Sequence, residues 1–426
     1  MRASKQVEAG VQFSPNTGEG PSPRIKIPFS EYIALSAFLT ALTALSIDIM
    51  LPALPAIAAD FAVPDPNDRQ LVVIMYFAGF GFGQLFWGPI SDRFGRIPIL
   101  TTGLAIFVAG SVLALLATSF EALLLARAVQ GLGSASSRVT VTAIARDLFS
   151  GARMSRVMSL IMTVFILVPV VAPILGQGLL FVGTWHLHFI VILAAGTAAL
   201  AWSRLRLPET RPAEVRSQSR GRLQRTFKAF ARERSSIAYM IACGLLFGCL
   251  CAFIANAQQI FAELYGLGEA FPYAFAAIAL AMAAAAMTNA RIVMRRGMRV
   301  VCHFALAGFV VLSCVLLAAA YLAPPPLVVF LPWLGLLFYL FGLVSPNLNA
   351  IVLEPMGDIA GLAASILGFT TTILAAVGGW LIGSAYDGSL LPFATGFAVL
   401  STAALGFVIL AEGPRGMFTN RSVQPE

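Results

Sequence analysis

The sequence predicts an all-α integral membrane protein, with twelve transmembrane helices in two six-helix halves. Its 426 residues are 58% hydrophobic and only 11% charged, whereas a soluble domain carries roughly 25% charged residues. Apolar runs of about twenty residues, each long enough to cross a bilayer as a helix, recur from end to end. One long basic segment separates six of these runs from the other six, which divides the chain into halves of similar length.

The twelve apolar runs follow one another with short connections. They lie at residues 31–58, 70–89, 99–118, 121–143, 157–180, 186–203, 237–261, 272–292, 300–322, 328–350, 361–384 and 390–411. The first run is the longest, and we expect Pro52 and Pro55 to kink its outer end. The expected organisation is a disordered cytoplasmic tail (1–28), an N-terminal half (29–203), a basic cytoplasmic linker (204–235), a C-terminal half (236–412) and a second cytoplasmic tail (413–426).

Charges in the connections predict the orientation. Arginines gather in alternate loops, at Arg93, Arg96, Arg153, Arg156, Arg295, Arg296 and Arg299, together with the linker. The intervening loops carry Asp60, Asp65, Asp68, Glu121, Glu263, Glu269 and Asp387, with Arg69 as the main exception. By the positive-inside rule both termini are then cytoplasmic.

The net charge of +8 does not indicate nucleic-acid binding, because ten of the Lys and Arg residues fall between positions 204 and 235. Such a basic linker beside a membrane is typical of a solvated segment attracted to anionic lipid. Two six-helix halves joined by a cytoplasmic linker are the layout of a secondary transporter, with its site where the halves meet.

The sequence contains few residues in patterns typical of an enzyme active site. The five cysteines, Cys243, Cys249, Cys251, Cys302 and Cys314, lie in apolar runs without metal-ligand spacing. The three histidines do not form a cluster, and no phosphate-binding glycine loop or HExxH pattern occurs. We therefore expect no metal, no cofactor and no enzymatic activity.

Two opposite charges inside the apolar runs stand out. Asp48 lies in the run 31–58 and Arg127 in the run 121–143, at similar depth. A charge at membrane depth is costly and usually persists because it is paired or functional. We expect both to face one central cavity, where Asp48 is ionised when paired and takes up a proton when the pair opens. The alternatives are a permanent ion pair that only joins two helices, and an Arg127 that snorkels to the membrane surface.

A third motif joins the second and third runs. Residues 88–96 read GPISDRFGR, with Gly88 and Gly95 suited to close approach and a tight turn. Asp92 is expected to face a helix N-terminus, while Arg93 and Arg96 anchor at lipid headgroups. The stretch resembles the signature of the major facilitator superfamily. The corresponding stretch 289–299 has arginines but no aspartate, so only the first half carries a complete gating motif.

Two further motifs resemble the drug:proton antiporters of that superfamily. Residues 125–133 read LARAVQGLG, which includes Arg127, Gln130 and Gly131. Residues 168–178 read VPVVAPILGQG, which keeps Pro173 and Gly176 of the antiporter pattern but has Ala172 and Gln177 at two glycine positions. Glycine and proline inside a span are also common for plain helix packing.

Residues 48–55 (DIMLPALP) and 360–365 (AGLAAS) are similar to the bicyclomycin and chloramphenicol resistance subgroup. This resemblance implies the major facilitator fold and a proton-coupled efflux transporter in the bacterial inner membrane, exporting small amphiphilic compounds such as phenicol-type antibiotics. The expected partners are the substrate, protons and membrane lipid, and we expect a monomer. A proton-coupled importer or a metabolite exporter on the same fold is the alternative.

Polar side chains elsewhere in the spans are candidates for lining the substrate cavity. They are Arg138, Gln177, Asn256, Gln259 and Asn347. For Arg138 the alternative is a side chain that reaches the cytoplasmic interface. For the amides the alternative is ordinary hydrogen bonding between helices.

Overall fold

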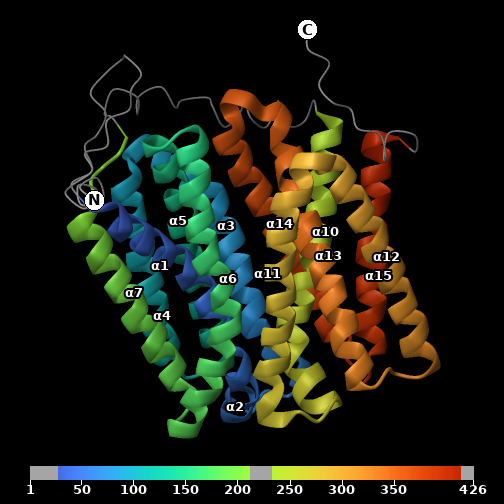
Figure 1. Cartoon of the computed structure of the whole chain (residues 1–426). Coiled ribbons are helices and arrows are strands. Elements are labelled where there is room, and N and C mark those ends of the chain that lie inside the picture. The colour runs from blue at the N-terminus through green and yellow to red at the C-terminus, as the bar shows by residue number, and fades with distance from the viewer. Residues whose placement is uncertain (1–26, 212–232, 414–426) are drawn as a thin grey trace, which may run out of the picture.

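The computed structural model describes residues 27–211 and 233–413, and every regular element in these ranges is helical. Most of the predicted tails 1–28 and 413–426 and most of the linker 204–235 lie outside the described residues. The helices form two bundles side by side, one from each half of the chain (Figure 1). The predicted all-α architecture of two six-helix halves is confirmed.

The N-terminal bundle consists of α1 (Phe29–Asp48), α2 (Leu54–Asp60), α3 (Leu71–Phe94), α4 (Arg96–Leu115), α5 (Phe120–Leu148), α6 (Gly151–Val182) and α7 (His186–Arg206). The C-terminal bundle consists of α10 (Arg234–Gln258), α11 (Phe271–Arg296), α12 (Met298–Leu322), α13 (Leu327–Leu353), α14 (Ala360–Ser384) and α15 (Leu391–Glu412). Short 3-10 segments occur at Leu51–Ala53, Pro66–Gln70, Gly268–Ala270 and Glu354–Ile359, and a π-helical turn occupies Gln259–Leu264.

These helices make twelve crossings of the membrane. In the described ranges, eleven stretches are long and apolar enough to span a membrane, and the first of them, Phe29–Asp60, joins α1 and α2. The twelfth crossing is α5, which has 29 residues but carries Arg127, Arg138 and many small polar side chains. Its buried residues contact other helices of the protein rather than lipid. A helix surrounded in this way can cross the membrane with a lower hydropathy than one that faces lipid.

The predicted kink in the first span is confirmed. The α-helix ends at Asp48, a 3-10 turn with Pro52 at its second position follows, and α2 resumes with Pro55 near its start. Proline lacks the amide hydrogen that a continuing helix needs, which explains the break. Asp48 is thereby placed at a helix end deep in the bundle.

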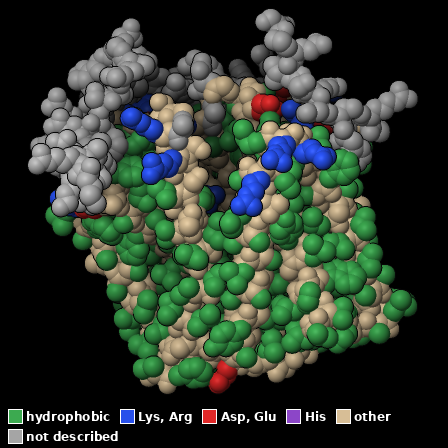
Figure 2. Space-filling view, viewed as in Figure 1, with side chains coloured by type: hydrophobic (Ala, Val, Ile, Leu, Met, Phe, Trp, Pro, Cys, Tyr) green, Lys and Arg blue, Asp and Glu red, His purple; other side chains and the backbone are tan. Residues whose placement is uncertain are grey.

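The ends of the bundles differ in charge. We call the end where α1 begins and α15 ends the basic face, because Arg93, Arg153, Arg156, Arg295 and Arg296 lie there on exposed side chains. The other end is the opposite face. The lateral surface between them is apolar, and Lys and Arg side chains gather only near the basic face in the view of Figure 2.

The two bundles meet along a seam between α3 and α14. Glycines bring the helices together, since a Cβ on Gly88 would lie 2.1 Å from Ser365 Oγ and one on Gly368 would lie 2.1 Å from Gln84 Oε1. Gln84 Nε2 also donates to Thr372 Oγ1 at 2.9 Å. A second contact between the bundles joins α6 and α11.

The bundles are tied together at the opposite face. Arg69 binds Glu263 with two contacts of 2.8 Å, and Asn67 Nδ2 donates to the carbonyl of Tyr386 at 2.8 Å. Among the described residues, every other ion pair joins groups within one bundle. Figure 2 shows the surface recessed between the bundles at the basic face. In this conformation the contacts of Arg69 and Asn67 close the opposite face, while the surface at the basic face is recessed.

Candidate functional site

Asp48 is a buried carboxylate at the break between α1 and α2, with 3% of its surface exposed. It forms no hydrogen bond or ion pair with any described residue. Although its two oxygens have no partner, they are not fully enclosed by protein atoms. Slight solvent access therefore remains, and the carboxylate can exchange a proton without breaking a bond to the protein.

The break beside Asp48 is clamped by α6. A Cβ on Gly176 would lie 2.2 Å from the carbonyl oxygen of Ile49 and 3.2 Å from Pro52, so only glycine allows this approach. The Gly176 carbonyl lies 2.9 Å from Nε2 of the buried His188 on α7. Pro173, one turn earlier, is also buried. Two motif residues of α6 thus pack where α1 ends.

Arg127 is fully buried and, together with Gln130, connects five helices. Its Nη2 donates to the carbonyl of Ser46 on α1, and its Nε donates to the carbonyl of Val72 on α3, both at 3.0 Å. Its guanidinium lies 4.6 Å from the centre of the Tyr76 ring and 5.9 Å from that of Phe189 on α7. Gln130, one turn further along α5, accepts from Arg127 Nη1. Gln130 in turn donates to Ser111 Oγ on α4 at 2.8 Å.

This geometry changes the expected relation between the two charges. Arg127 binds the backbone two residues before Asp48 but does not form an ion pair with its carboxylate. The permanent ion pair is absent, and a snorkelling Arg127 is excluded because its donors bind interior carbonyls. Carbonyl dipoles and an aromatic face stabilise the buried cation instead.

Gly131 explains why α5 can lie so close to α3. A Cβ there would lie 2.1 Å from the Tyr76 carbonyl oxygen, and one on Gly79 would lie 1.9 Å from that of Ala128. The two glycines let the helix backbones touch, so that Arg127 reaches the Val72 carbonyl. Thr43 and Ser134, 2.9 Å apart, add a contact between α1 and α5.

The five candidates for the cavity lie in different places. Arg138 is exposed on α5, four residues before Thr142 and eight before Arg146, which are exposed on the same side of that helix. Gln177 is half-buried on α6 and has no described hydrogen-bond partner. Asn256 is buried on α10, where its Nδ2 donates to the Ala252 carbonyl and its Oδ1 has no partner.

Gln259 and Asn347, which were also expected to line the cavity, both have hydrogen-bond partners in this conformation. Gln259 begins the π-helical turn after α10 and donates to Asn67 Oδ1 at 3.0 Å, so it belongs to the closure at the opposite face. Asn347 is 3% exposed and donates to Asn289 Oδ1 at 2.7 Å, which joins α13 to α11. Asn347 thus follows the alternative reading, a hydrogen bond between helices.

The GPISDRFGR motif forms a compact cage at the basic face. Gly95, with a φ of 107°, is the single residue between α3 and α4. Arg96 binds Asp92 at 2.8 Å and Asp147, at the end of α5, at 2.9 Å. The expected lipid anchor at Arg96 is wrong, because the side chain is 1% exposed and held by carboxylates. Arg93 is exposed.

Asp147 and Glu209 belong to this cage and were not predicted. Glu209 accepts from the backbone N–H groups of Arg96 and Ile97, at 2.9 and 3.2 Å, and so caps the start of α4. Arg211 adds a contact of 3.3 Å to Asp92. The sequence signal that could have indicated them is a carboxylate that follows a predicted span. Asp147 follows the span that becomes α5, and Glu209, in the stretch LPET at 207–210, follows the span that becomes α7.

The C-terminal half has its own arginine cage, in contrast to the prediction of a single complete gating motif. Arg299, near the start of α12, binds Glu354 at 2.7 Å and Glu412 at 3.1 Å. Tyr239 on α10 donates to Glu412 at 2.9 Å and lies 2.8 Å from His303 Nε2. The carboxylates come from the ends of α13 and α15, so no aspartate near Arg299 was needed.

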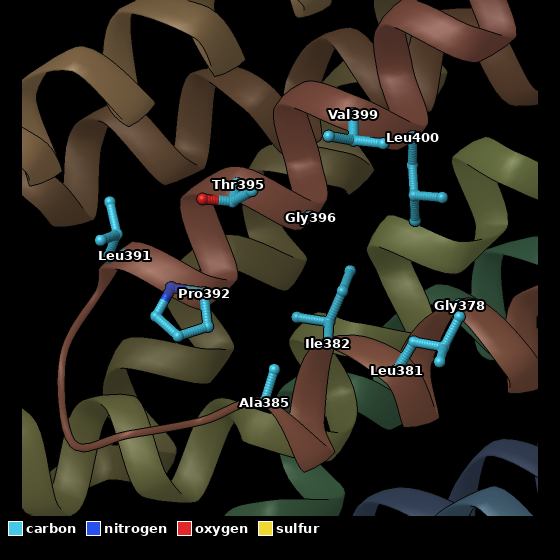
Figure 3. Close-up of a pocket in the computed structure, with 10 residues that line it drawn as sticks. All are labelled: Gly378, Leu381, Ile382, Ala385, Leu391, Pro392, Thr395, Gly396, Val399 and Leu400. Atoms are coloured by element: carbon cyan, nitrogen blue, oxygen red, sulfur yellow. The ribbon is translucent and has the colours of Figure 1, made fainter.

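A cavity of about 450 Å³ on the lateral surface lies away from these groups (Figure 3). It lies between α14 and α15, and Thr395 is the one lining residue with a polar side chain. Its walls include Leu381, Ile382 and Leu391. An apolar groove on this surface suits a lipid chain and offers no group that exchanges a proton, so it is distinct from the site around Asp48.

The sequence profile of the Major Facilitator Superfamily matches residues 36–379. The chain belongs to this superfamily. As a major facilitator protein it is a multi-pass membrane transporter rather than an enzyme. It is 33% identical to a bicyclomycin resistance protein homolog of Haemophilus influenzae over 364 residues, which cover 83% of this chain and 89% of the relative. It is also 35% identical to the multidrug resistance protein MdtL of Citrobacter koseri, over 45% of this chain and 49% of the relative.

Solved major facilitator structures share the fold at low identity. The xylose transporter XylE from E. coli, in a partially occluded inward-open conformation, aligns with a TM-score of 0.71 at 13% identity, covering 90% of this chain and 98% of that one. The human organic anion transporter MFSD10 aligns with a TM-score of 0.67 at 20% identity, covering 91% of this chain and all of the other. At these identities the likeness concerns the fold alone.

Proposed function

We propose that this transporter exports small amphiphilic compounds, phenicol-type antibiotics among them, in exchange for protons across the bacterial inner membrane. The observation that carries the proposal is the unpaired, buried and slightly accessible carboxylate of Asp48 at the break in the first span. The names of the bicyclomycin and multidrug resistance relatives support drug export.

The proposed orientation places the basic face in the cytoplasm, together with the start of α1 and the end of α15. The exposed arginines at that face support this choice, because cytoplasmic loops carry an excess of Lys and Arg. The recess at the basic face is then the cytoplasmic entrance, and the closure at Arg69 and Glu263 is the outer gate. Both termini are cytoplasmic in this arrangement.

The proposed exchange uses Asp48 as the proton carrier. With the outer gate closed, a substrate enters from the cytoplasm, and its polar groups replace water around the ionised carboxylate after the proton has left. When the outer side opens, the substrate departs and Asp48 takes a proton from outside. Burial disfavours an ionised carboxylate that lacks a partner, so protonation precedes the return to the inward-open state.

Arg127 has a positioning role in this scheme rather than a protonation step. It holds the carbonyl of Ser46, two residues before Asp48, and fixes the end of α1 against α3 and α5. Gly176 fixes the same end from α6. Asp48 therefore lies on a rigid N-terminal bundle, and the movement of the other bundle decides which side it faces.

The test uses the full chain in liposomes with an imposed pH gradient and a dye that reports internal pH. Addition of chloramphenicol is expected to move protons with the wild type but not with Asp48→Asn. Glu121→Gln, a neutralised and exposed carboxylate in the first turn of α5, is the control and should retain the signal. Proton movement by Asp48→Asn at the wild-type rate would contradict the role of Asp48. A wild type that moves no protons with any phenicol would refute the substrate assignment.

A further inference from the structure

We propose that the groove between α11 and α12 at the basic face binds an anionic phospholipid. The groove has a volume of about 560 Å³ and lies on the lateral surface of the C-terminal bundle. It is lined by Ile292, Arg295, Arg296, Val300, Val301, Phe304, Ala305, Leu340 and Leu343. This site is separate from the transport route through Asp48 and does not depend on the proposed substrate.

The packing of three helices creates the groove. α11 and α12 each pack extensively on α13, but they touch one another much less. Leu340 and Leu343 of α13 line the space between them, and Phe304 of α12, 59% exposed, lines its outer part. The channel is thus apolar below its arginines and open to the membrane, as an acyl chain requires.

The arginines at the groove have no neutralising partner in the described part of the protein. Arg295 and Arg296 are exposed and have no carboxylate within ion-pair distance among the described residues. Arg299, one turn away, is instead held by Glu354 and Glu412. The two glutamates thus bind Arg299, whereas the guanidinium groups of Arg295 and Arg296 stay beside the groove. Guanidinium groups match the oxygens of a phosphate group well.

The start of α12 adds a further preference for an anion. Gly297, with a φ of 81°, connects α11 to α12 and is the N-cap of α12, which has no side-chain hydrogen bond at this end. The first N–H groups of α12 are therefore free of a side-chain cap, next to Val300 on the groove wall. Positive groups at the membrane surface above an apolar channel match a lipid with an anionic headgroup.

The test measures lipid retention by native mass spectrometry on the full chain in detergent, titrated with phosphatidylglycerol or with phosphatidylcholine. The wild type is expected to retain one phosphatidylglycerol in preference to phosphatidylcholine. Two lost arginine contacts should reduce its affinity for phosphatidylglycerol about thirtyfold in Arg295→Gln/Arg296→Gln, at about a kilocalorie each. The control Arg153→Gln/Arg156→Gln removes two exposed arginines from α6 at the same face and should retain the preference.

A second variant tests the apolar part of the groove. Leu340→Trp fills the channel while both arginines remain, and it should lower phosphatidylglycerol retention without changing the proton signal in liposomes. Glycerol 1-phosphate, which has the headgroup chemistry without acyl chains, should not compete. An unchanged preference in the arginine variant, an equal loss in the control, or competition by glycerol 1-phosphate would each overturn the proposal.

Discussion

Arg69 and Glu263, which are 194 positions apart in the sequence, form a two-point ion pair that joins the bundles at the opposite face. The pair explains why an arginine lies among the acidic loops that otherwise follow the positive-inside rule. Arg69 is buried, whereas the Glu263 side chain is 45% exposed, so solvent weakens the attraction. We therefore expect the pair to favour closure at the opposite face without preventing that face from opening.

Glu263→Gln is expected to destabilise the closure at the opposite face by about 1 kcal/mol, which corresponds to about a fivefold shift toward the state open at that face. The measurement is the rate at which a membrane-impermeant maleimide labels Asn256→Cys in a Cys314→Ser background, because Cys314 is the exposed native cysteine. The exchange Arg69→Glu/Glu263→Arg should return labelling toward the starting rate. Equal labelling in all three proteins would show that the pair does not hold the gate.

Arg127→Lys should destabilise the N-terminal bundle. A lysine ammonium cannot reproduce three bonds in different directions or lie flat on Tyr76, and a cost of about 2–4 kcal/mol is expected. Thermal unfolding in detergent, followed by intrinsic fluorescence, would show the loss. Arg138→Lys is the matched control on the same helix, and its exposed side chain should leave the unfolding temperature unchanged. A proton signal lost in Arg127→Lys at unchanged stability would instead indicate direct participation in coupling.

Gly176→Ala tests the contact of α6 with the end of α1. The added methyl group would lie 2.2 Å from the Ile49 carbonyl oxygen, so the helices must separate and Asp48 must shift. We expect drug-linked proton movement to fall by at least tenfold, in line with a misplacement of a reactive group by an ångström or less. Gly178→Ala, two residues further along, meets nothing within 4 Å and should behave as the wild type. Similar losses in both variants would point to helix propensity rather than to the contact.

Asp147→Asn should loosen the cage around Arg96. The buried guanidinium would keep Asp92 but lose its charged partner on α5, at an expected cost of about 3 kcal/mol. Limited proteolysis at the basic face and the unfolding temperature would report the change. Arg93→Gln, at the exposed arginine of the same motif, should alter neither, and a loss as large as that of Asp147→Asn would contradict the assignment of the cage to Arg96.

Hydropathy and proline placement predicted the twelve spans and the kink, because these depend on lipid contact and on backbone geometry that each local sequence carries. The helix ends were predicted less well. α5 continues to Leu148 and α6 begins at Gly151, beyond the expected boundaries at 143 and 157. Hydropathy marks the apolar part of a helix, whereas these ends carry Arg146, Asp147 and Arg153 into the aqueous layer.

The sequence indicated candidate residues for the site but not the contacts between them. Arg127 binds backbone carbonyls, and carbonyls are present at every position, so nothing in the sequence identifies the carbonyls of Ser46 and Val72 as its partners. Gln259 lies at the closure of the opposite face, at the start of a π-helical turn that the hydropathy pattern does not reveal. Arg96 binds Asp147 through its side chain and Glu209 through its backbone N–H. Both partners come from segments far away in the sequence, so local patterns do not indicate these contacts.

The seam between α3 and α14 also limits how a compound dissolved in the bilayer can arrive. Gly88 against Ser365 and Gln84 against Thr372 leave no room for a molecule to slip sideways between these helices. Under the proposed function, a hydrophobic drug would then have to reach Asp48 by way of the aqueous side rather than directly from the hydrocarbon on this flank. Uptake into the protein would then depend on how fast the drug leaves the membrane as well as on how strongly it binds.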